Sequence, residues 1–207
     1  CIYPQIPHIK PYHNDAVWPF VQAYWALASA KTGNEEAVLQ SIAAIYRSAS
    51  LFLTNKENFV AANGDFKGTA INSDRQLWSV AANLAIVYKI YFGMEFMPDG
   101  LMFSPFVPEP FEGIKELKGF IYRDALLDIS ISGFGNQVRS FTLDGVKSQP
   151  FIPGNLTGMH KIEIALEENN PLPQPVNMQE VRFSLPAPEY RLAGDSLIID
   201  GIKGQNK

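Results

Sequence analysis

The chain has 207 residues, enough for one large domain or two small ones. Hydrophobic residues make up 46% and charged residues 18%, a composition that excludes an intrinsically disordered chain. The formal net charge is −4 and no basic tract is present, so we expect no nucleic-acid partner. No run of about 18 apolar residues is free of polar interruptions, so we expect no membrane span. The single cysteine, Cys1, excludes an intrachain disulfide and a cysteine-rich zinc site.

The first half of the chain predicts three helices, at about residues 18–32, 34–53 and 74–92. Pro19 suits the first position of a helix, because its missing N–H would be unpaired there. Asn34 is a good N-cap, and the two glutamates after it lie near the positive end of the helix dipole. Residues 73–76 read Ser-Asp-Arg-Gln, which is the pattern of a capping box. We therefore expect the third helix to begin at this box.

These helices are apolar around most of their circumference, whereas a lone surface helix shows one apolar stripe. Three such helices cannot cover one another, so either the second half of the chain covers them or further helices do. We expect the three helices alone to leave an apolar surface. The residues expected on it are Tyr24, Leu27, Ile42, Ile45, Leu84 and Val87.

The second half of the chain alternates between apolar and polar residues, in short runs divided by Gly and Pro. The predicted strands are residues 119–123, 126–131, 137–143, 160–166, 181–185 and 196–201. Strands of this length and spacing are typical of an antiparallel β-sandwich, which we expect from about residue 118. We therefore predict an α+β fold with two domains, residues 1–100 and 101–207. Gly93 closes the last helix in the left-handed conformation.

Three segments combine polar and aromatic residues at the ends of the predicted helices, namely residues 11–19, 55–59 and 72–79. Sugar-binding sites need this mixture, because aromatic rings stack on pyranose rings while amides and charged groups bind hydroxyls. A site that hydrolyses a glycoside needs two carboxylic acids in addition to these sugar-binding groups. Each residue also has a structural explanation: His13 and Asn14 form a turn before a helix, Asp74 faces a helix dipole, and Glu57 lies in a loop.

Other chemistry finds less support in the sequence. The histidines His8, His13 and His160 are too scattered for a metal site, and no phosphate-binding loop or nucleophile elbow is present. Apart from Trp18, which adjoins the polar cluster, we interpret the tryptophans as core residues. The residues alone therefore indicate a carbohydrate-handling helical domain joined to a β-sandwich.

At the three polar segments the chain resembles the six-hairpin glycosidases, in particular the glycogen-debranching-type amylo-α-1,6-glucosidase group and its relatives. Residues 12–19 resemble the family signature Tyr-His-Asn-Gly-x-Val-Trp-Pro, with Asp15 in place of the glycine. Residues 73–81 are similar to the family's Gln-x-Trp-Ser-x-Ala helix start. Segments similar to the exit from the helical domain are residues 91–94, 98–101 and 106–108. The resemblance covers about residues 10–130.

The resemblance implies a C-terminal portion of a glycoside hydrolase that acts on an oligo- or polysaccharide as an inverting α-glycosidase. The helices would be the end of an (α/α)6 toroid, whose other helices and general acid lie in the upstream part of the same enzyme. Glu57 takes the place of the general base, with Asp15 as its rival. The implied substrate-binding residues are His13, Asn14, Asp15, Trp18, Asp74, Arg75 and Gln76. The partners would be the carbohydrate and the upstream part, and no cofactor and no metal are implied.

Three alternatives stay open. A disaccharide phosphorylase of similar fold would replace the base with phosphate and would need anion-binding loops. A polysaccharide lyase would place Tyr12, His13 and Asn14 against a uronate. A non-catalytic module would use the sandwich for carbohydrate binding or for structure; exposed aromatic residues on a sheet would favour binding, and the buried alternation favours structure.

Overall fold

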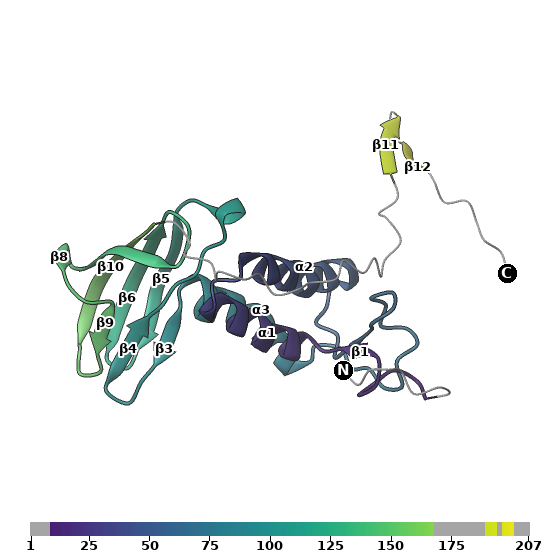
Figure 1. The fold of residues 1–207 in the computed structure, drawn as a ribbon, viewed down its shortest axis with the longest axis horizontal. Coiled ribbons are helices and arrows are strands. Elements are labelled where there is room, and N and C mark those ends of the chain that lie inside the picture. Colours follow the sequence, from purple (N-terminus) through teal and green to yellow (C-terminus); the bar gives the residue numbers. More distant parts are fainter. Residues whose placement is uncertain (1–8, 168–188, 194–195, 201–207) are drawn as a thin grey trace.

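The computed structural model describes residues 9–167, 189–193 and 196–200. These residues form an α+β fold in which helices come first and sheets follow (Figure 1). The predicted strand at residues 181–185 and His8 lie outside the described residues. No helix among those described is long and apolar enough to cross a bilayer.

The first two helices begin where the sequence predicts. Helix α1 (Pro19–Lys31) has Pro19 in its first turn and Trp18 at the N-cap. Helix α2 (Glu35–Phe52) is capped by Asn34, whose side chain accepts a hydrogen bond from the backbone N–H of Ala37 at 3.1 Å. Both predicted helix starts are confirmed.

The third helix begins later than predicted, and the capping box is wrong. Helix α3 (Leu77–Ala85) continues as a π-helix, η1 (Ile86–Tyr91). Arg75 is left-handed at φ 55°, and Gln76 is extended with no side-chain cap bond. The backbone of this segment instead bonds to an earlier loop, since the N–H of Gln76 donates to the carbonyl of Asn55 at 2.9 Å. These long-range bonds replace the local capping pattern.

The three helices share one core. Helix α1 packs against both α2 and α3, and side chains from all three interlock. The buried residues of this core are Ala23, Ala26, Val38, Ile42, Ile45, Ala82, Ile86, Ile90 and Phe106. Within the described residues the helices form no closed ring.

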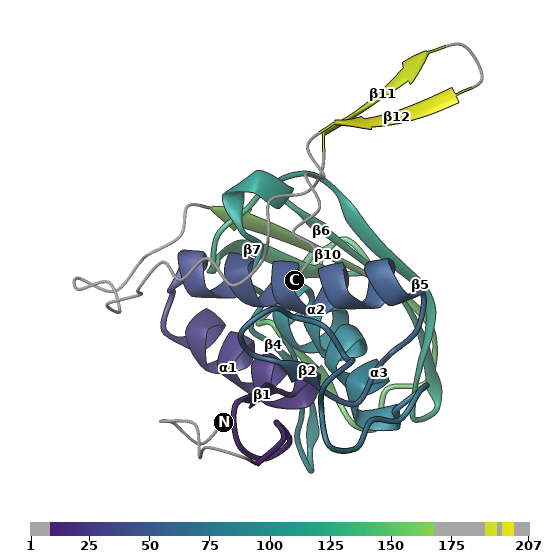
Figure 2. The same cartoon turned by 90° about the vertical axis from the view of Figure 1, so that its right-hand side faces the viewer.

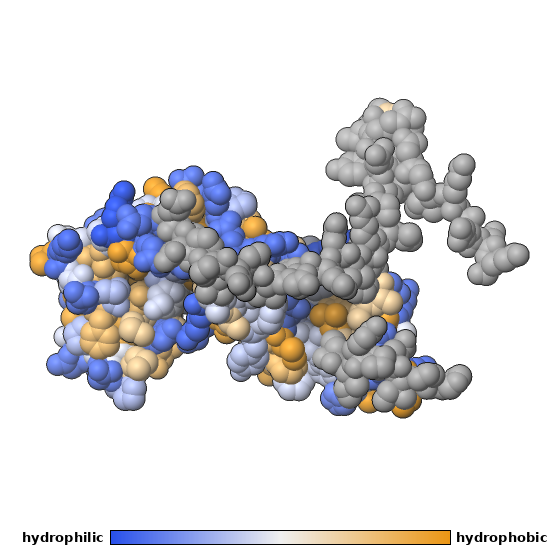
Figure 3. Space-filling view, viewed as in Figure 1, coloured by the Kyte–Doolittle hydropathy of each residue, from blue (hydrophilic) through white to orange (hydrophobic). Residues whose placement is uncertain are grey.

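The expected apolar surface is present in part. Tyr24 is 70% exposed and Leu84 is 49% exposed, as predicted. Ile42 and Ile45 are buried, because they lie on the face of α2 that meets the other helices; for these two the prediction was wrong. Leu27 and Val87 are half-buried. Figure 3 shows hydrophobic residues at the surface of both the helical and the sheet regions.

Two sheets follow the helices. The smaller sheet has the order β3–β4–β9 and is antiparallel, with strands β3 (Met94–Phe96), β4 (Gly100–Phe103) and β9 (Phe151–Pro153). The larger sheet has the order β5–β6–β10–β7–β8. Its strands are β5 (Lys115–Tyr122), β6 (Ala125–Ser132), β7 (Gln137–Leu143), β8 (Val146–Lys147) and β10 (Gly158–Glu167). The 3₁₀-helix η2 (Glu109–Phe111) precedes β5.

The larger sheet is mixed, which corrects the prediction of an antiparallel sandwich. Strand β10 runs parallel to β6, with Ile162 opposite Ile129, and antiparallel to β7. The other pairs in both sheets are antiparallel. Alternation along a strand shows which side chains point inward, but it does not show which strand lies beside it.

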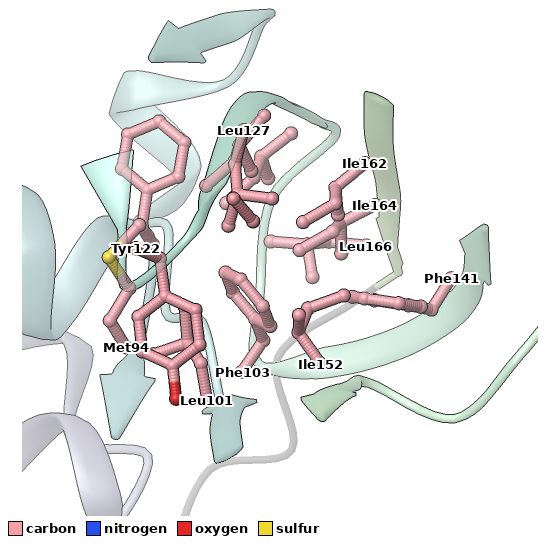
Figure 4. Packing of buried hydrophobic residues seen from close by; sticks show 14 of the residues in the cluster. Met94, Leu101, Phe103, Tyr122, Leu127, Phe141, Ile152, Ile162, Ile164 and Leu166 are labelled. Carbon is pink, nitrogen blue, oxygen red and sulfur yellow. The ribbon is translucent and has the colours of Figure 1, made fainter. Parts of the chain in front are cut away.

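The inner faces of the two sheets pack on each other and form a second core. Figure 4 shows side chains of both sheets pointing into this space. Met94, Leu101, Phe103 and Ile152 come from the smaller sheet, and Leu127, Ile129, Phe141, Ile162, Ile164 and Leu166 from the larger one. Because β3 belongs to this arrangement, the change from helix to sheet falls between residues 91 and 94.

The helical region and the two sheets meet in a closely packed segment. Gly93 ends the helical segment at φ 58°, as the sequence predicts. Phe106 follows β4 and is buried among the helices, and its N–H donates to the carbonyl of Ile90 at 2.8 Å. In Figure 2 the helices lie in front of the sheets. The hairpin of β11 (Glu189–Ala193) and β12 (Ser196–Asp200) lies apart from both regions in Figures 1 and 2.

Candidate functional site

A short strand pair brings two of the predicted site segments together. Strand β1 (Ala16–Val17) pairs antiparallel with β2 (Phe59–Val60), with Ala16 opposite Val60. In this antiparallel pair the residues before β1 face the residues after β2, and the N–H of Ala61 donates to the carbonyl of Asp15 at 3.0 Å. The pairing anchors the two segments side by side, and the side chain of Tyr12 reaches Glu57 from there.

The contact between these segments joins Tyr12 and Glu57. The Tyr12 hydroxyl donates a hydrogen bond to Oε1 of Glu57 at 2.7 Å, and Glu57 is only 5% exposed. This hydrogen bond is the main cause that raises the pKa of the Tyr12 phenol above its ordinary value; desolvation and the carboxylate charge add to it. Tyr12 is therefore a protonated donor at neutral pH, held against the carboxylate.

A network of amide groups holds the backbone of Glu57 and Asn58. The N–H of Glu57 donates to the carbonyl of Ser73 at 3.0 Å and to Oδ1 of Asn72 at 3.3 Å. Nδ2 of Asn72 donates to the carbonyl of Asn58 at 2.7 Å. The Asn58 side chain is fully buried and donates to the carbonyl of Ile71 at 3.1 Å. Glu57 thus projects from a fixed loop with polar neighbours.

Tyr12 also lines an aromatic hollow of about 230 Å³. The indole N–H of Trp18 donates to the carbonyl of Tyr12 at 2.8 Å, and the ring of His13 is nearly parallel to that of Trp18, at 5.6 Å and 7°. Phe20 and Trp78 stack at 4.7 Å. The hollow is lined by Tyr12, His13, Trp18, Phe20, Val21 and Trp78. Its walls are almost entirely aromatic, which suits the apolar face of a sugar ring.

Asn14 and Asp15 lie beside this hollow and contribute through their backbones. Asn14 is buried, and its carbonyl accepts the N–H of Tyr12 at 3.0 Å. Asp15 is left-handed at φ 52°, and its carbonyl accepts the N–H of Ala61 at 3.0 Å. A positive φ is the conformation in which glycine has no steric cost and which Asp tolerates better than most residues. Among the described residues no hydrogen bond joins the Asp15 carboxylate to Glu57.

Asp74, Arg75 and Gln76 belong to the segment that is hydrogen-bonded to the Glu57 loop. None of them lines the hollow. The Asp74 carboxylate lies 2.5 Å from Nζ of Lys56. Arg75 is exposed. The carbonyl of Gln76 accepts the N–H groups that begin α3. The sequence places these three residues near the site, and the structure gives them contacts that hold the loop.

Several residues of the site were missed by sequence reasoning. Tyr12 stood in the signature but was given a role only in the lyase alternative, and Asn72 and Phe20 were not singled out. Trp78 and Trp25 were interpreted as core, but they are 45% and 44% exposed. An available signal for Trp78 was its place at the very start of a helix, next to a polar segment.

No family model and no curated protein matches the chain. In the part of the chain that is described, no three His, Cys, Asp or Glu side chains gather as a metal site would require. A larger concavity of about 490 Å³ lies on the five-stranded sheet, but its lining contains no Phe, Tyr or Trp. Of the two, the hollow beside Tyr12 is the one with aromatic walls.

Proposed function

We propose that the chain is the C-terminal portion of an inverting α-glycosidase, with Glu57 as the general base. One observation carries the proposal: a buried carboxylate that receives a phenol hydrogen bond at 2.7 Å, with that phenol also lining an aromatic hollow. Carboxylates of this kind act on water in glycoside hydrolysis, and aromatic walls hold the sugar. The resemblance of residues 12–19 and 73–81 to the six-hairpin glycosidases supports the same assignment.

In this proposal one oxygen of Glu57 takes a proton from water while that water attacks the anomeric carbon. The glycosidic C–O bond breaks with its electron pair moving to the leaving oxygen, which receives a proton from the general acid. That acid belongs to the upstream part of the enzyme. Inversion needs about 6.5–9.5 Å between the two carboxyl groups, so that the water fits between them.

The contact between Tyr12 and Glu57 argues against a polysaccharide lyase. A lyase that used Tyr12 as its base would need the phenol to ionise, yet the hydrogen bond to Glu57 raises the pKa of that phenol. The Glu57 carboxylate would also repel a uronate carboxylate. Both effects oppose abstraction of a proton from a uronate by this group.

The surroundings of Glu57 also argue against a phosphorylase, which would need cations or free amides for phosphate. The nearest cation in the sequence, Lys56, is paired with Asp74, and its ammonium group lies 3.8 Å from the centre of the Phe66 ring. A phosphate at Glu57 would instead meet a carboxylate. Water is the nucleophile that this environment favours.

The exposed face of the helices supports the upstream part as a partner. Tyr24 on α1 and Leu77 on α3 are 70% and 83% exposed, and both helices are otherwise packed on apolar neighbours. We propose that the remaining helices of an (α/α)6 toroid cover this face. Large apolar side chains that are exposed become buried when further helices pack on them.

The test is made in the enzyme with its upstream helices, on maltooligosaccharides and on α-1,6-linked glucosides. Glu57→Gln keeps the shape of the side chain and removes the base, so kcat should fall about 10²- to 10⁴-fold. Azide is an anion that can attack the sugar in place of water without help from a general base. It should therefore restore turnover of the Glu57→Ala variant. Glu163→Gln, in an exposed ion pair of the sandwich, is the matched control and should turn over normally.

The anomer first released, read by proton NMR, reports inversion or retention. Normal turnover in Glu57→Gln together with loss in Asp15→Asn would move the base to Asp15. If the Glu57→Gln and Asp15→Asn variants both remain fully active, the hydrolase assignment is wrong. Sugar binding without turnover by the unmodified enzyme would instead indicate a non-catalytic module.

A further inference from the structure

We propose that Tyr12 is a positioning residue that fixes the carboxylate of Glu57, an inference that rests on the function proposed above. Its hydroxyl donates to Oε1 at 2.7 Å. Among the described residues it is the sole donor to either carboxylate oxygen of Glu57. The bond engages Oε1 and leaves Oε2 as the oxygen that takes a proton from water.

Glu57 needs such a partner because its last side-chain torsion is intrinsically loose. The terminal torsion of glutamate is broad rather than confined to sharp wells. The backbone of Glu57 is held by the carbonyl of Ser73 and by Asn72, but these bonds do not set the plane of the carboxylate. The hydrogen bond from the Tyr12 hydroxyl sets that plane.

Tyr12 is itself held on several sides, so it can serve as a fixed reference. Its backbone carbonyl accepts the indole N–H of Trp18, and its N–H donates to Asn14. Its ring meets the rings of Trp18 and His13 edge-on, with centroid distances of 4.9 Å and 4.6 Å. None of these contacts uses the hydroxyl. Removing the hydroxyl alone therefore leaves the ring in place.

Tyr12→Phe is the sharpest perturbation. We expect kcat to fall about 10- to 100-fold, the loss of one hydrogen bond to a charged group, with little change in KM. Because the ring that lines the hollow is kept, a loss of kcat at unchanged KM reports the orientation of the Glu57 carboxylate and not the binding of the sugar.

Tyr122→Phe is the matched control. Tyr122 is buried in the sandwich core, and its hydroxyl has no hydrogen-bond partner in the described structure. The same chemical change there should leave both kcat and KM as in the unmodified enzyme. A thermal unfolding scan of Tyr12→Phe shows whether the variant is folded.

A second readout does not depend on activity. In protein labelled with ¹³C at tyrosine Cζ, the Tyr12 signal is assigned by its absence in Tyr12→Phe and followed through an alkaline titration. In Glu57→Gln the phenol loses its carboxylate partner, so it should titrate at lower pH than in the unmodified protein. An unchanged Tyr12 titration would show that the two groups are not coupled and would overturn the proposal.

The outcomes separate this inference from the proposed function. A coupled titration with a normal kcat in Tyr12→Phe leaves Glu57 as the base and overturns the positioning role. If the Tyr12 titration depends on Glu57 but Glu57→Gln turns over fully, Glu57 is not the general base. Both proposals then fail, although the contact exists. A coupled titration with a loss of kcat in both variants and an unchanged KM in Tyr12→Phe supports the inference.

Discussion

Gly93 should be the least replaceable glycine at the junction between helices and sheets. Its φ is 58°, and a Cβ built there would lie 2.0 Å from the carbonyl carbon of Ser104 and 2.2 Å from the nitrogen of Pro105. These are backbone atoms, so they cannot rotate away. In Gly93→Ala the segment after η1 must separate from the segment that carries Phe106.

The cost can be worked from two terms. A left-handed conformation costs an L-residue about 1–2 kcal/mol. Separating the two segments also breaks the bond from the N–H of Ser104 to the carbonyl of Gly93, 2.8 Å in the structure, and loosens that of Phe106 to Ile90. At about 1 kcal/mol for each bond, the expected loss of unfolding free energy is about 3–4 kcal/mol.

Urea unfolding followed by circular dichroism measures this loss, and Gly145→Ala is the control. Gly145 is also left-handed, at φ 78°, but a Cβ added there would meet no atom within 4 Å. It should lose only the conformational term of about 1–2 kcal/mol. Equal losses in the two variants would refute the steric argument, because they would show that the junction relaxes at no cost.

Two further predictions concern the junction and the sandwich. Phe106→Ala should cost about 3–5 kcal/mol in urea unfolding, because Phe106 is buried in the helical core, whereas Phe111→Ala at an exposed site should cost far less. Nδ1 of His160 lies 2.6 Å from Asp144 and Nε2 lies 2.9 Å from the carbonyl of Thr157, and these bonds raise the pKa of His160. The stabilisation is therefore complete below the ordinary His pKa of about 6.5 and is lost as pH rises through the raised value. We expect Tm to fall over this pH range in the unmodified protein but not in His160→Gln. An equal fall in both proteins would contradict this reasoning.

The local features of the fold were predictable because they depend on neighbouring residues. Pro19 and Asn34 mark the first two helix starts, and the structure uses both. Gly93 closes the helical region as predicted. Residues 73–76 show where this reasoning fails: their capping pattern competes with backbone bonds to residues 55–57, which local sequence does not reveal.

The site was predictable in its segments but not in its contacts. The sequence identified Glu57 and the segment at residues 12–19 as parts of one site, and the pairing of β1 with β2 brings them together. Which side chains meet outside that pairing depends on the three-dimensional path of both segments. For this reason Tyr12 was given a role only in the lyase alternative, although it makes the central hydrogen bond to Glu57. Ile42 and Ile45 were misjudged for a related reason, because the pattern of α2 does not say which face its neighbours cover.

The position of β10 between β6 and β7 has a consequence for synthesis on the ribosome. Strands β6 and β7 are separated by only residues 133–136, yet β10 lies between them and pairs with both. A nascent chain that ends before Gly158 has no partner for the inner edges of β6 and β7. Pairing over long sequence separations is slow. We therefore expect the larger sheet to close late, with β6 and β7 held apart or mispaired until β10 has emerged.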